Sequence, residues 1–388
     1  MTDRFRWHPE ARLFDGTGAE VRPAGQSGQI LPDAPQGLAA AIGHPAFRIG
    51  APDQPPPEPH ADPILETLTS GSTGQPRRIR RTQASWIASF AVNATLGIGP
   101  GARIATLGRL VHSLSLYGAI ESLHLGAEVH LLADLRPDRQ GAALGERRIS
   151  TLYATPAQLR LLDGTEPLPD LRLILVGGSK LDPALRARIA ALAPNAQVRE
   201  FYGAAETSFI TLTDEATPDT SVGRPYPGVD LTLDASGEVW VRSPYLFLGY
   251  ANPTSAFPPG TRWRDGWLSV GEVGSLEDGY LILKGRAGRM VTVADQNVFP
   301  EEIEALLHTL PGVTRAAVLA VPDPKRGHSL VAILQGDPTT EAAILSTLRQ
   351  TLGPLKSPKS LMWRQDWPML ASGKTDLKAL EAQLTWPV

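Results

Sequence analysis

The stretch TSGSTGQPR, residues Thr69–Arg77, is the part of the chain around which the rest is organised. It interleaves hydroxyl side chains with glycines, and a basic run follows at once at Arg78, Arg80 and Arg81. Glycine lets backbone N–H groups converge on an anion, hydroxyls add donors, and arginine supplies a charge that does not titrate at neutral pH. The stretch therefore fits a polyphosphate, although its composition is equally typical of a polar turn between two elements.

Length and composition limit the class of protein. A chain of 388 residues is longer than one hydrophobic core ordinarily serves, and this length predicts two or three packed units. The net charge of −3 argues against a general nucleic-acid binder, so we expect no nucleic-acid partner. The N-terminal sequence MTDRFRWHPE lacks the apolar core of a signal peptide, and no later run is apolar enough to span a membrane. We therefore expect a cytoplasmic protein.

The sequence contains no cysteine. Disulfides, thiolate metal sites and cysteine nucleophiles are thereby excluded. Any thioester chemistry must use a thiol that a substrate brings.

Strand and helix signals alternate after the loop. Leu65–Thr69 is typical of a strand and 82–96 of a helix with Thr82 as its N-cap, so the loop joins a strand to a helix. The next expected strands are 103–107, 128–132, 151–154, 171–176 and 198–202, and the expected helices are 114–125, 157–162 and 183–192. This alternation predicts parallel βαβ units, whose ligands bind at the carboxyl ends of the strands.

The domain organisation follows from two changes of pattern. The first 60 residues are rich in proline and glycine and are interpreted as polar linker or surface loop. Short β-runs begin at Gly223, and a flexible charged joint lies at Gly285–Arg289. We expect an α/β N-terminal domain at 1–285, whose residues 223–285 form a β-rich subdomain, and a mobile α+β domain at 286–388.

Five motifs in this order resemble those of the adenylate-forming superfamily, which includes acyl- and aryl-CoA ligases, peptide-synthetase adenylation domains and luciferases. They are TSGSTGQPR at 69–77, FYGAAETSF at 201–209, WLSVGEVG at 267–274, GRAGRMVTVADQNVFPEEIE at 285–304 and LASGKTDL at 370–377. The resemblance covers the chain from about Leu65 to its end and implies the fold of that family.

The resemblance also implies the cofactors ATP, Mg²⁺ and coenzyme A, and a small carboxylic acid as substrate. It assigns the ATP phosphates to Thr69, Ser70, Gly71, Ser72, Thr73, Gly74 and Arg77, with Thr73 also counted as catalytic. It assigns the rest of the nucleotide to Tyr202, Gly203, Ala204, Glu272 and Arg286. Without the resemblance, each of these side chains has an ordinary structural interpretation, such as a turn or a solvated surface.

Three further roles depend on the same resemblance. Glu206 is expected to hold Mg²⁺ against the phosphates, because hard oxygen ligands suit that ion. Lys374 is expected to offset the charge that builds up when a carboxylate attacks the α-phosphate. His112, Gly177 and Gly178 are expected at the acid pocket, where the glycines leave room for substrate, and Arg289 at the hinge.

The chain departs from the family pattern in ways that leave alternatives open. The region before residue 69 is short, glutamate at 272 replaces the usual aspartate, and Ala294-Asp295 replaces a glycine-rich pair near the thiol channel. After adenylation, the acyl group is expected to be transferred to the thiol of coenzyme A. The alternatives are the phosphopantetheine of an acyl carrier protein, or a relative that binds nucleotide or acyl groups without catalysis.

Overall fold

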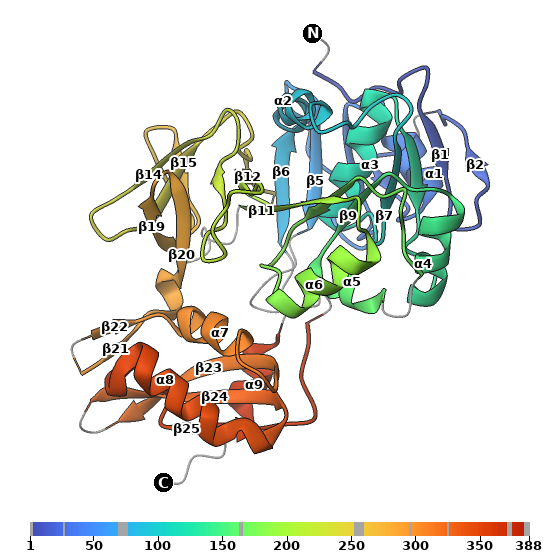
Figure 1. Ribbon diagram of the computed structural model, residues 1–388. Coiled ribbons are helices and arrows are strands. Elements are labelled where there is room, and N and C mark those ends of the chain that lie inside the picture. Colours follow the sequence, from blue (N-terminus) through green and yellow to red (C-terminus); the bar gives the residue numbers. More distant parts are fainter. Residues whose placement is uncertain are drawn as a thin grey trace.

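The computed structural model describes residues 3–25, 28–68, 77–162, 166–251, 260–294, 296–323, 326–370 and 375–383. Figure 1 shows helices packed around sheets in an N-terminal part, with a smaller α+β unit beneath it. The predicted fold class, α/β with a small C-terminal domain, is confirmed. Among these residues no helix combines the length and the apolar character that a bilayer crossing needs.

A nine-stranded sheet forms the centre, in the order β13-β12-β11-β10-β9-β7-β8-β1-β2. Its strands from β1 to β11 pair in parallel except for the edge pair β1–β2, as the βαβ pattern predicts. The bounds are β1 Arg12–Phe14, β2 Glu20–Val21, β7 Arg103–Thr106, β8 Glu128–Leu131, β9 Thr151–Ala154, β10 Leu173–Val176, β11 Gln197–Ala204, β12 Ser208–Leu212 and β13 Arg224–Pro225.

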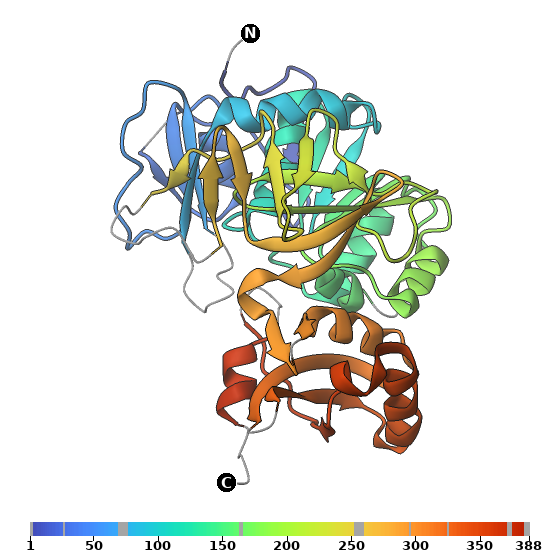
Figure 2. The ribbon, with the colours of Figure 1, turned by 90° about the vertical axis from the view of Figure 1, so that its left-hand side faces the viewer.

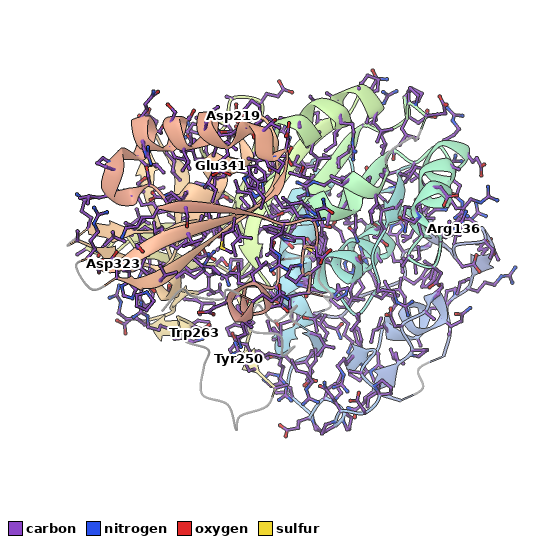
Figure 3. The ribbon with its side chains drawn as sticks, turned by 90° about the horizontal axis from the view of Figure 1, so that it is seen from below. Arg136, Asp219, Tyr250, Trp263, Asp323 and Glu341 are labelled. Carbon is purple, nitrogen blue, oxygen red and sulfur yellow. The ribbon has the colours of Figure 1, made fainter. Side chains whose placement is uncertain are left out.

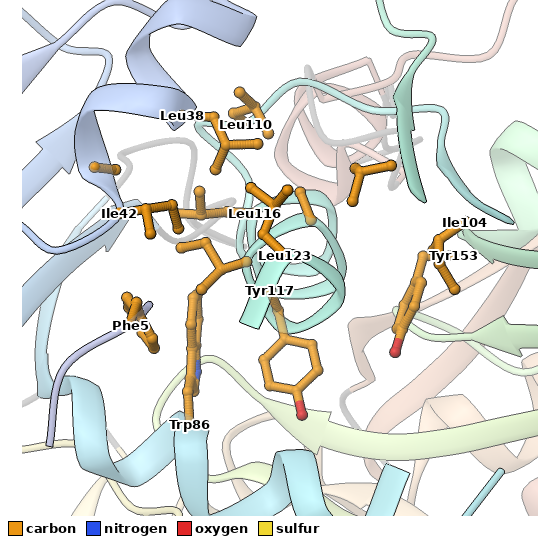
Figure 4. Packing of buried hydrophobic residues seen from close by; sticks show 14 of the residues in the cluster. Phe5, Leu38, Ile42, Trp86, Ile104, Leu110, Leu116, Tyr117, Leu123 and Tyr153 are labelled. Carbon is orange, nitrogen blue, oxygen red and sulfur yellow. The ribbon is translucent and has the colours of Figure 1, made fainter. Parts of the chain in front are cut away.

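Helices cover both faces of this sheet. Leu173 and Leu175 of β10 pack into the cluster that contains α3 (Figure 4), whereas Ile174 and Val176 point to the opposite cluster. Successive side chains of a strand point to opposite faces of the sheet, and here both faces are buried. Each strand is therefore an uninterrupted run of apolar residues. The helices are α2 Gln83–Ala94, α3 Ser113–Leu125, α4 Pro137–Glu146, α5 Pro156–Leu161 and α6 Pro183–Leu192.

A second sheet, β16-β6-β5-β4-β3, places the two strands that flank residues 69–76 side by side. It corrects the interpretation of the first 60 residues as linker, because Phe5, Leu13 and Phe47 are at most 1% exposed in the core. Strands of two to four residues between Pro/Gly turns are too short to show a period. The bounds are β3 Ile30–Leu31, α1 Pro35–Ala41, β4 Ala46–Ile49, β5 Ile64–Leu68, β6 Arg78–Thr82 and β16 Gly249–Tyr250.

The β-rich region contributes a four-stranded sheet, β14-β15-β18-β17, and the hairpin β19–β20. A further strand of this region, β16, pairs with β6 of the second sheet, so backbone hydrogen bonds join the β-rich region to the N-terminal part. The bounds are β14 Asp230–Leu233, β15 Val239–Arg242, β17 Arg262–Arg264, β18 Trp267–Ser269, β19 Glu272–Glu277 and β20 Tyr280–Arg286.

The C-terminal unit follows β20 and lies below the other sheets in Figure 2. A long antiparallel pair, β23–β24, is extended by β25, and α7 and α8 pack on it around Ile303, Val318 and Leu348. The bounds are η1 Ala287–Arg289, β21 Val291–Val293, β22 Gln296–Val298, α7 Pro300–His308, β23 Val313–Asp323, β24 Gly327–Gly336, η2 Pro338–Thr340, α8 Glu341–Lys356, β25 Ser360–Trp363 and α9 Leu377–Ala382.

Candidate active site

The turn between β11 and β12 presents Glu206 at the edge of the central sheet. A Cβ on Gly203 would lie 1.8 Å from the carbonyl oxygen of Ser208, so only glycine fits there. Ser208 itself has φ 56°, a left-handed conformation that side chains rarely adopt. The Thr207 hydroxyl accepts a hydrogen bond from the N–H of Ala204 at 2.9 Å. A tight and partly strained turn therefore fixes the backbone position of Glu206.

Two residues that sequence reasoning missed hold this turn and its carboxylate. The Tyr250 hydroxyl donates to Glu206 Oε1 at 2.7 Å, and burial, then the nearby Glu206, raises the pKa of Tyr250. Arg81 is 1% exposed and donates to the Ser208 hydroxyl and the Ala205 carbonyl, at 2.7 and 2.5 Å. Burial lowers the pKa of Arg81 to about 10, against the opposing effect of Glu206. The basic run after residue 77 was the one signal for Arg81.

Tyr202, Glu272 and Arg286 form a second group of predicted site residues. Arg286 Nε donates to Glu272 Oε1 at 3.0 Å across the open end of the β19–β20 hairpin. Burial raises the pKa of Tyr202 and Glu272 adds to the effect, whereas Arg286 opposes it, so all three groups are close. The Tyr202 hydroxyl is buried and has no hydrogen-bond partner among the described residues. A ligand with hydroxyl or ring-nitrogen groups can satisfy it.

His112 lies where the second sheet meets α3. Its backbone forms a parallel bridge to Leu68, the last residue of β5 before positions 69–76, and the Ser113 hydroxyl donates to the Thr67 hydroxyl at 3.1 Å. Burial lowers the pKa of His112, with Asp33 opposing the effect, which favours a neutral imidazole at pH 7. The chain thus brings His112 to the start of the predicted phosphate loop.

The pocket glycines are placed at the carboxyl end of β10, as predicted, but the space beside one of them is filled. A Cβ on Gly177 would lie 2.2 Å from the ring of Phe201. Phe201 packs on Phe209 with ring centroids 4.7 Å apart. Gly178 has φ 101° and therefore meets a backbone requirement. The missing side chain at 177 makes room for an aromatic ring of the protein.

The remaining predicted residues divide into two sets. Arg77 is half-buried just before β6, and its charge is close enough to Tyr250 to oppose the rise in that residue's pKa. The predicted residues that lie outside the described part of the chain are Thr69, Ser70, Gly71, Ser72, Thr73, Gly74, Asp295 and Lys374. No group of three or more metal-ligating side chains occurs within the described ranges.

The joint between the two parts of the chain contains two arginines that face opposite ways. Arg286 is paired with Glu272 on the N-terminal side, as described above. Arg289 donates to Glu304 Oε1 at 2.8 Å, to Glu304 Oε2 at 3.1 Å and to the Val318 carbonyl at 3.0 Å, all in the C-terminal unit. A Cβ on the intervening Gly288 would meet nothing within 4 Å.

Comparison with known proteins gives independent evidence for the family of this chain. The model of the AMP-binding enzyme family matches residues 8–251, and the model of the AMP-binding enzyme C-terminal domain matches residues 302–374. An uncharacterized acyl-CoA ligase of Bacillus subtilis (strain 168) is 32% identical over 328 residues, which cover 80% of this chain and 67% of that protein. A 3-hydroxybenzoate–CoA ligase of Aromatoleum sp. (strain CIB) is 28% identical and covers 94% of this chain and 74% of its own length.

Two solved structures have the same fold. An o-succinylbenzoate CoA synthetase from Bacillus subtilis, in complex with its acyl-adenylate intermediate, has a TM-score of 0.73 and 24% identity, covering 84% of this chain and 70% of that one. An amide bond synthetase from Marinactinospora thermotolerans has a TM-score of 0.73 and 26% identity, covering 92% and 79%. The chain spans about two thirds of the length of the Bacillus ligase.

Proposed function

The chain belongs to the AMP-binding enzyme family, and from that premise we propose that it activates a small carboxylic acid with ATP and passes the acyl group to the thiol of coenzyme A. In the first step a carboxylate oxygen bonds to the α-phosphorus of ATP and pyrophosphate leaves. In the second step the thiol sulfur bonds to the acyl carbon, AMP leaves, and the thiol proton passes to solvent. As a member of this family the protein is an AMP-forming acid–thiol ligase.

The single observation that carries the proposal is the group formed by Tyr202, Glu272 and Arg286. A buried hydroxyl without a partner, next to a carboxylate and a guanidinium, suits the ring and ribose of a nucleotide. Glu272 can accept from ribose hydroxyls while Arg286 stays paired to it. Glutamate in place of aspartate keeps the acceptor oxygens, and one of them accepts from Arg286, its register partner on β20.

The other residues have roles that follow from position. We assign Mg²⁺ to Glu206 together with phosphate oxygens of ATP, because Mg²⁺ commonly takes one or two protein carboxylates and substrate phosphates. Tyr250 holds that carboxylate in place, and Arg81 holds the turn that carries it. Arg77 adds positive charge for the leaving pyrophosphate. We assign Lys374 to the reacting α-phosphate, where an ammonium offsets the charge of the transition state.

The acid is proposed to be compact. Phe201, which fills the space beside Gly177, packs with Phe209 and Tyr226 into one aromatic layer, the last two with ring centroids 4.6 Å apart. A ring in the space beside Gly177 favours a short or aromatic acid over a long chain. Because His112 stays neutral at pH 7, it contributes no charge to attract a second carboxylate.

The test is acid-dependent exchange of labelled pyrophosphate into ATP, measured across aliphatic and aromatic acids. We expect exchange with at least one small acid, lost in Lys374→Ala and reduced in Glu272→Gln. Exchange that is absent with every acid contradicts the adenylation step. Mass spectrometry with coenzyme A and with phosphopantetheinylated carrier proteins tests the acceptor. A thioester that forms on a carrier protein and not on coenzyme A contradicts the second step.

A further inference from the structure

One buried carboxylate ties together the strands on either side of residues 69–76. Glu66 of β5 is 0% exposed, and the strand register places Arg48 of β4 and Arg80 of β6 directly beside it. Glu66 Oε2 accepts from Arg48 Nη1 at 3.0 Å and lies 3.4 Å from Arg78 Nε. The other oxygen, Oε1, accepts from Arg80 Nε at 3.2 Å and from its Nη2 at 3.0 Å. The carboxylate therefore binds one guanidinium from β4 and two from β6.

These contacts change the interpretation of the basic run that follows residue 77. The composition of the run suggests that Arg78 and Arg80 add charge for a polyphosphate, but both side chains turn toward Glu66. Arg78 also donates to the Pro55 carbonyl at 2.6 Å, and Arg48 donates to the same carbonyl at 2.8 Å. The arginines of the cluster are therefore committed to the protein and hold the proline-rich segment before β5 against the sheet.

Stability alone does not require such a cluster. Burial lowers the pKa of Arg48, an effect that Glu66 opposes and the charge of Arg78 increases, so the guanidiniums are held close together at a cost. A further acid, Glu58, lies at the exposed rim, 3.5 Å from Arg80. Well-packed apolar residues commonly stabilise a fold at least as well as buried ion pairs do, whereas charged groups fix one geometry. The cluster therefore indicates that β5 and β6 need a defined position.

The strand that carries Arg78 and Arg80 also supports the carboxylate at the β11–β12 turn. The Arg78 carbonyl accepts from the Ala251 N–H at 2.9 Å, directly after Tyr250 of β16, which pairs with β6. Tyr250, labelled in Figure 3, donates to Glu206 Oε1 at 2.7 Å. A displacement of β6 therefore shifts the partner of Glu206 together with the end of residues 69–76.

We propose that Glu66 is a positioning residue for the phosphate side of the site. Because it is 0% exposed, it contacts no ligand itself. By holding Arg78 and Arg80 it fixes the points at which the chain leaves β5 and enters β6, and with them the strand that supports Glu206. The role in ATP and Mg²⁺ binding rests on the proposed function, whereas the contacts of Glu66 do not.

The test is pyrophosphate exchange by Glu66→Gln, which keeps the shape of the side chain and removes its charge. We expect the KM for MgATP to rise about tenfold and kcat to fall less than about twofold, because the ATP complex and the transition state lose the same phosphate contacts. Glu58→Gln is the matched control, since Glu58 also contacts Arg80 but is exposed, and its KM should not change. Arg80→Gln is a second variant, which removes two contacts to Glu66, keeps the pairing with Arg48 and should raise the KM in the same way.

The outcomes separate positioning from a merely structural role. A structural role predicts a lower melting temperature and fewer active molecules, hence a lower kcat with an unchanged KM for MgATP, and that result in Glu66→Gln and Arg80→Gln overturns the proposal. Absence of exchange with every acid in the native sequence contradicts the proposed function instead. Calorimetric binding of magnesium pyrophosphate to the full chain then decides the role of Glu66. Weaker binding by Glu66→Gln supports it, and equal binding, or no binding by the native sequence, overturns it.

Discussion

Replacing one buried carboxyl should change how stability depends on pH. Glu121 in α3 is 0% exposed and accepts hydrogen bonds from Asn93 at 2.8 Å, from Tyr117 at 2.9 Å and from Tyr153. Burial raises the pKa of Glu121 from 4.5 to about 7, against the lowering effect of these three donors. The folded protein therefore keeps a proton that the unfolded chain has already released.

The sign and size of the effect follow by linkage. Below about pH 4.5 the carboxyl is protonated in both states and has no effect. Between that pH and about 7 the native state binds more protons, so stability falls as pH rises, and above 7 the loss is constant. A span of about 2.5 pH units at 1.36 kcal/mol each gives roughly 3 kcal/mol. Glu121→Gln removes the ionisation and keeps one oxygen, the position that accepts from both Asn93 and Tyr117.

The assay is urea unfolding at several values between pH 5 and pH 8, followed by the near-ultraviolet circular dichroism of the aromatic residues. We expect the stability of Glu121→Gln relative to the native sequence to rise by roughly 2 to 3 kcal/mol across this range, because it starts half a pH unit above the pKa of the unfolded chain. Glu20→Gln is the control, because its exposed carboxyl bonds to Arg12, which lowers its pKa, and it should leave the pH dependence between 5 and 8 unchanged. Parallel stability curves for Glu121→Gln and the native sequence would refute the reasoning.

Three further substitutions have defined outcomes. Gly203→Ala places a Cβ 1.8 Å from the Ser208 carbonyl oxygen and should cost about 3 kcal/mol or more, seen as a lower melting temperature together with loss of pyrophosphate exchange. Ala294→Gly relieves a left-handed residue, φ 46°, in the β21–β22 turn and should stabilise the C-terminal unit by up to about 1 kcal/mol in thermal unfolding. Tyr250→Phe removes the donor to Glu206 and should raise the Mg²⁺ concentration needed for half-maximal exchange roughly tenfold, and an unchanged Mg²⁺ dependence would contradict the assigned role.

The fold could be predicted where local signals were strong. The helix at 183–192 has the predicted bounds because Asp182 caps it, accepting from the Leu185 N–H at 2.8 Å, and Pro183 occupies its first turn. The helix α2 begins as expected, since the Thr82 side chain accepts from the Ser85 N–H, but the loop before it was expected to lead from a strand into this helix and instead joins the two strands β5 and β6. The prediction that the first 60 residues form a linker or surface loop was wrong, because their strands are stabilised by pairing with strands far away in the sequence, as β1 is by β8.

The candidate site was predicted only in part, and for a physical reason. Motifs locate residues such as Glu206 and Glu272 along the chain, but what holds them comes from elements far away in sequence. Arg81 reaches Ser208 across 127 positions, and Tyr250 reaches Glu206 across 44. The space beside Gly177 was expected to hold substrate. The ring of Phe201 occupies it, and nothing in the sequence near Gly177 indicates this.

The joint described above also sets the kind of barrier that a swing of the C-terminal unit has to cross. Arg289 stays with Glu304, Arg286 stays with Glu272, and the Ala287 N–H remains bonded to the Gly271 carbonyl at 2.8 Å. An added Cβ on Gly288 would meet nothing within 4 Å, so its backbone torsions can change, but three hydrogen bonds span it: the Met290 N–H donates to the Arg286 and Ala287 carbonyls, and the Arg286 N–H donates to Glu301. A swing therefore separates Arg286 from the Glu301 carboxylate of α7, so its rate should depend on ionic strength as well as on temperature and solvent viscosity.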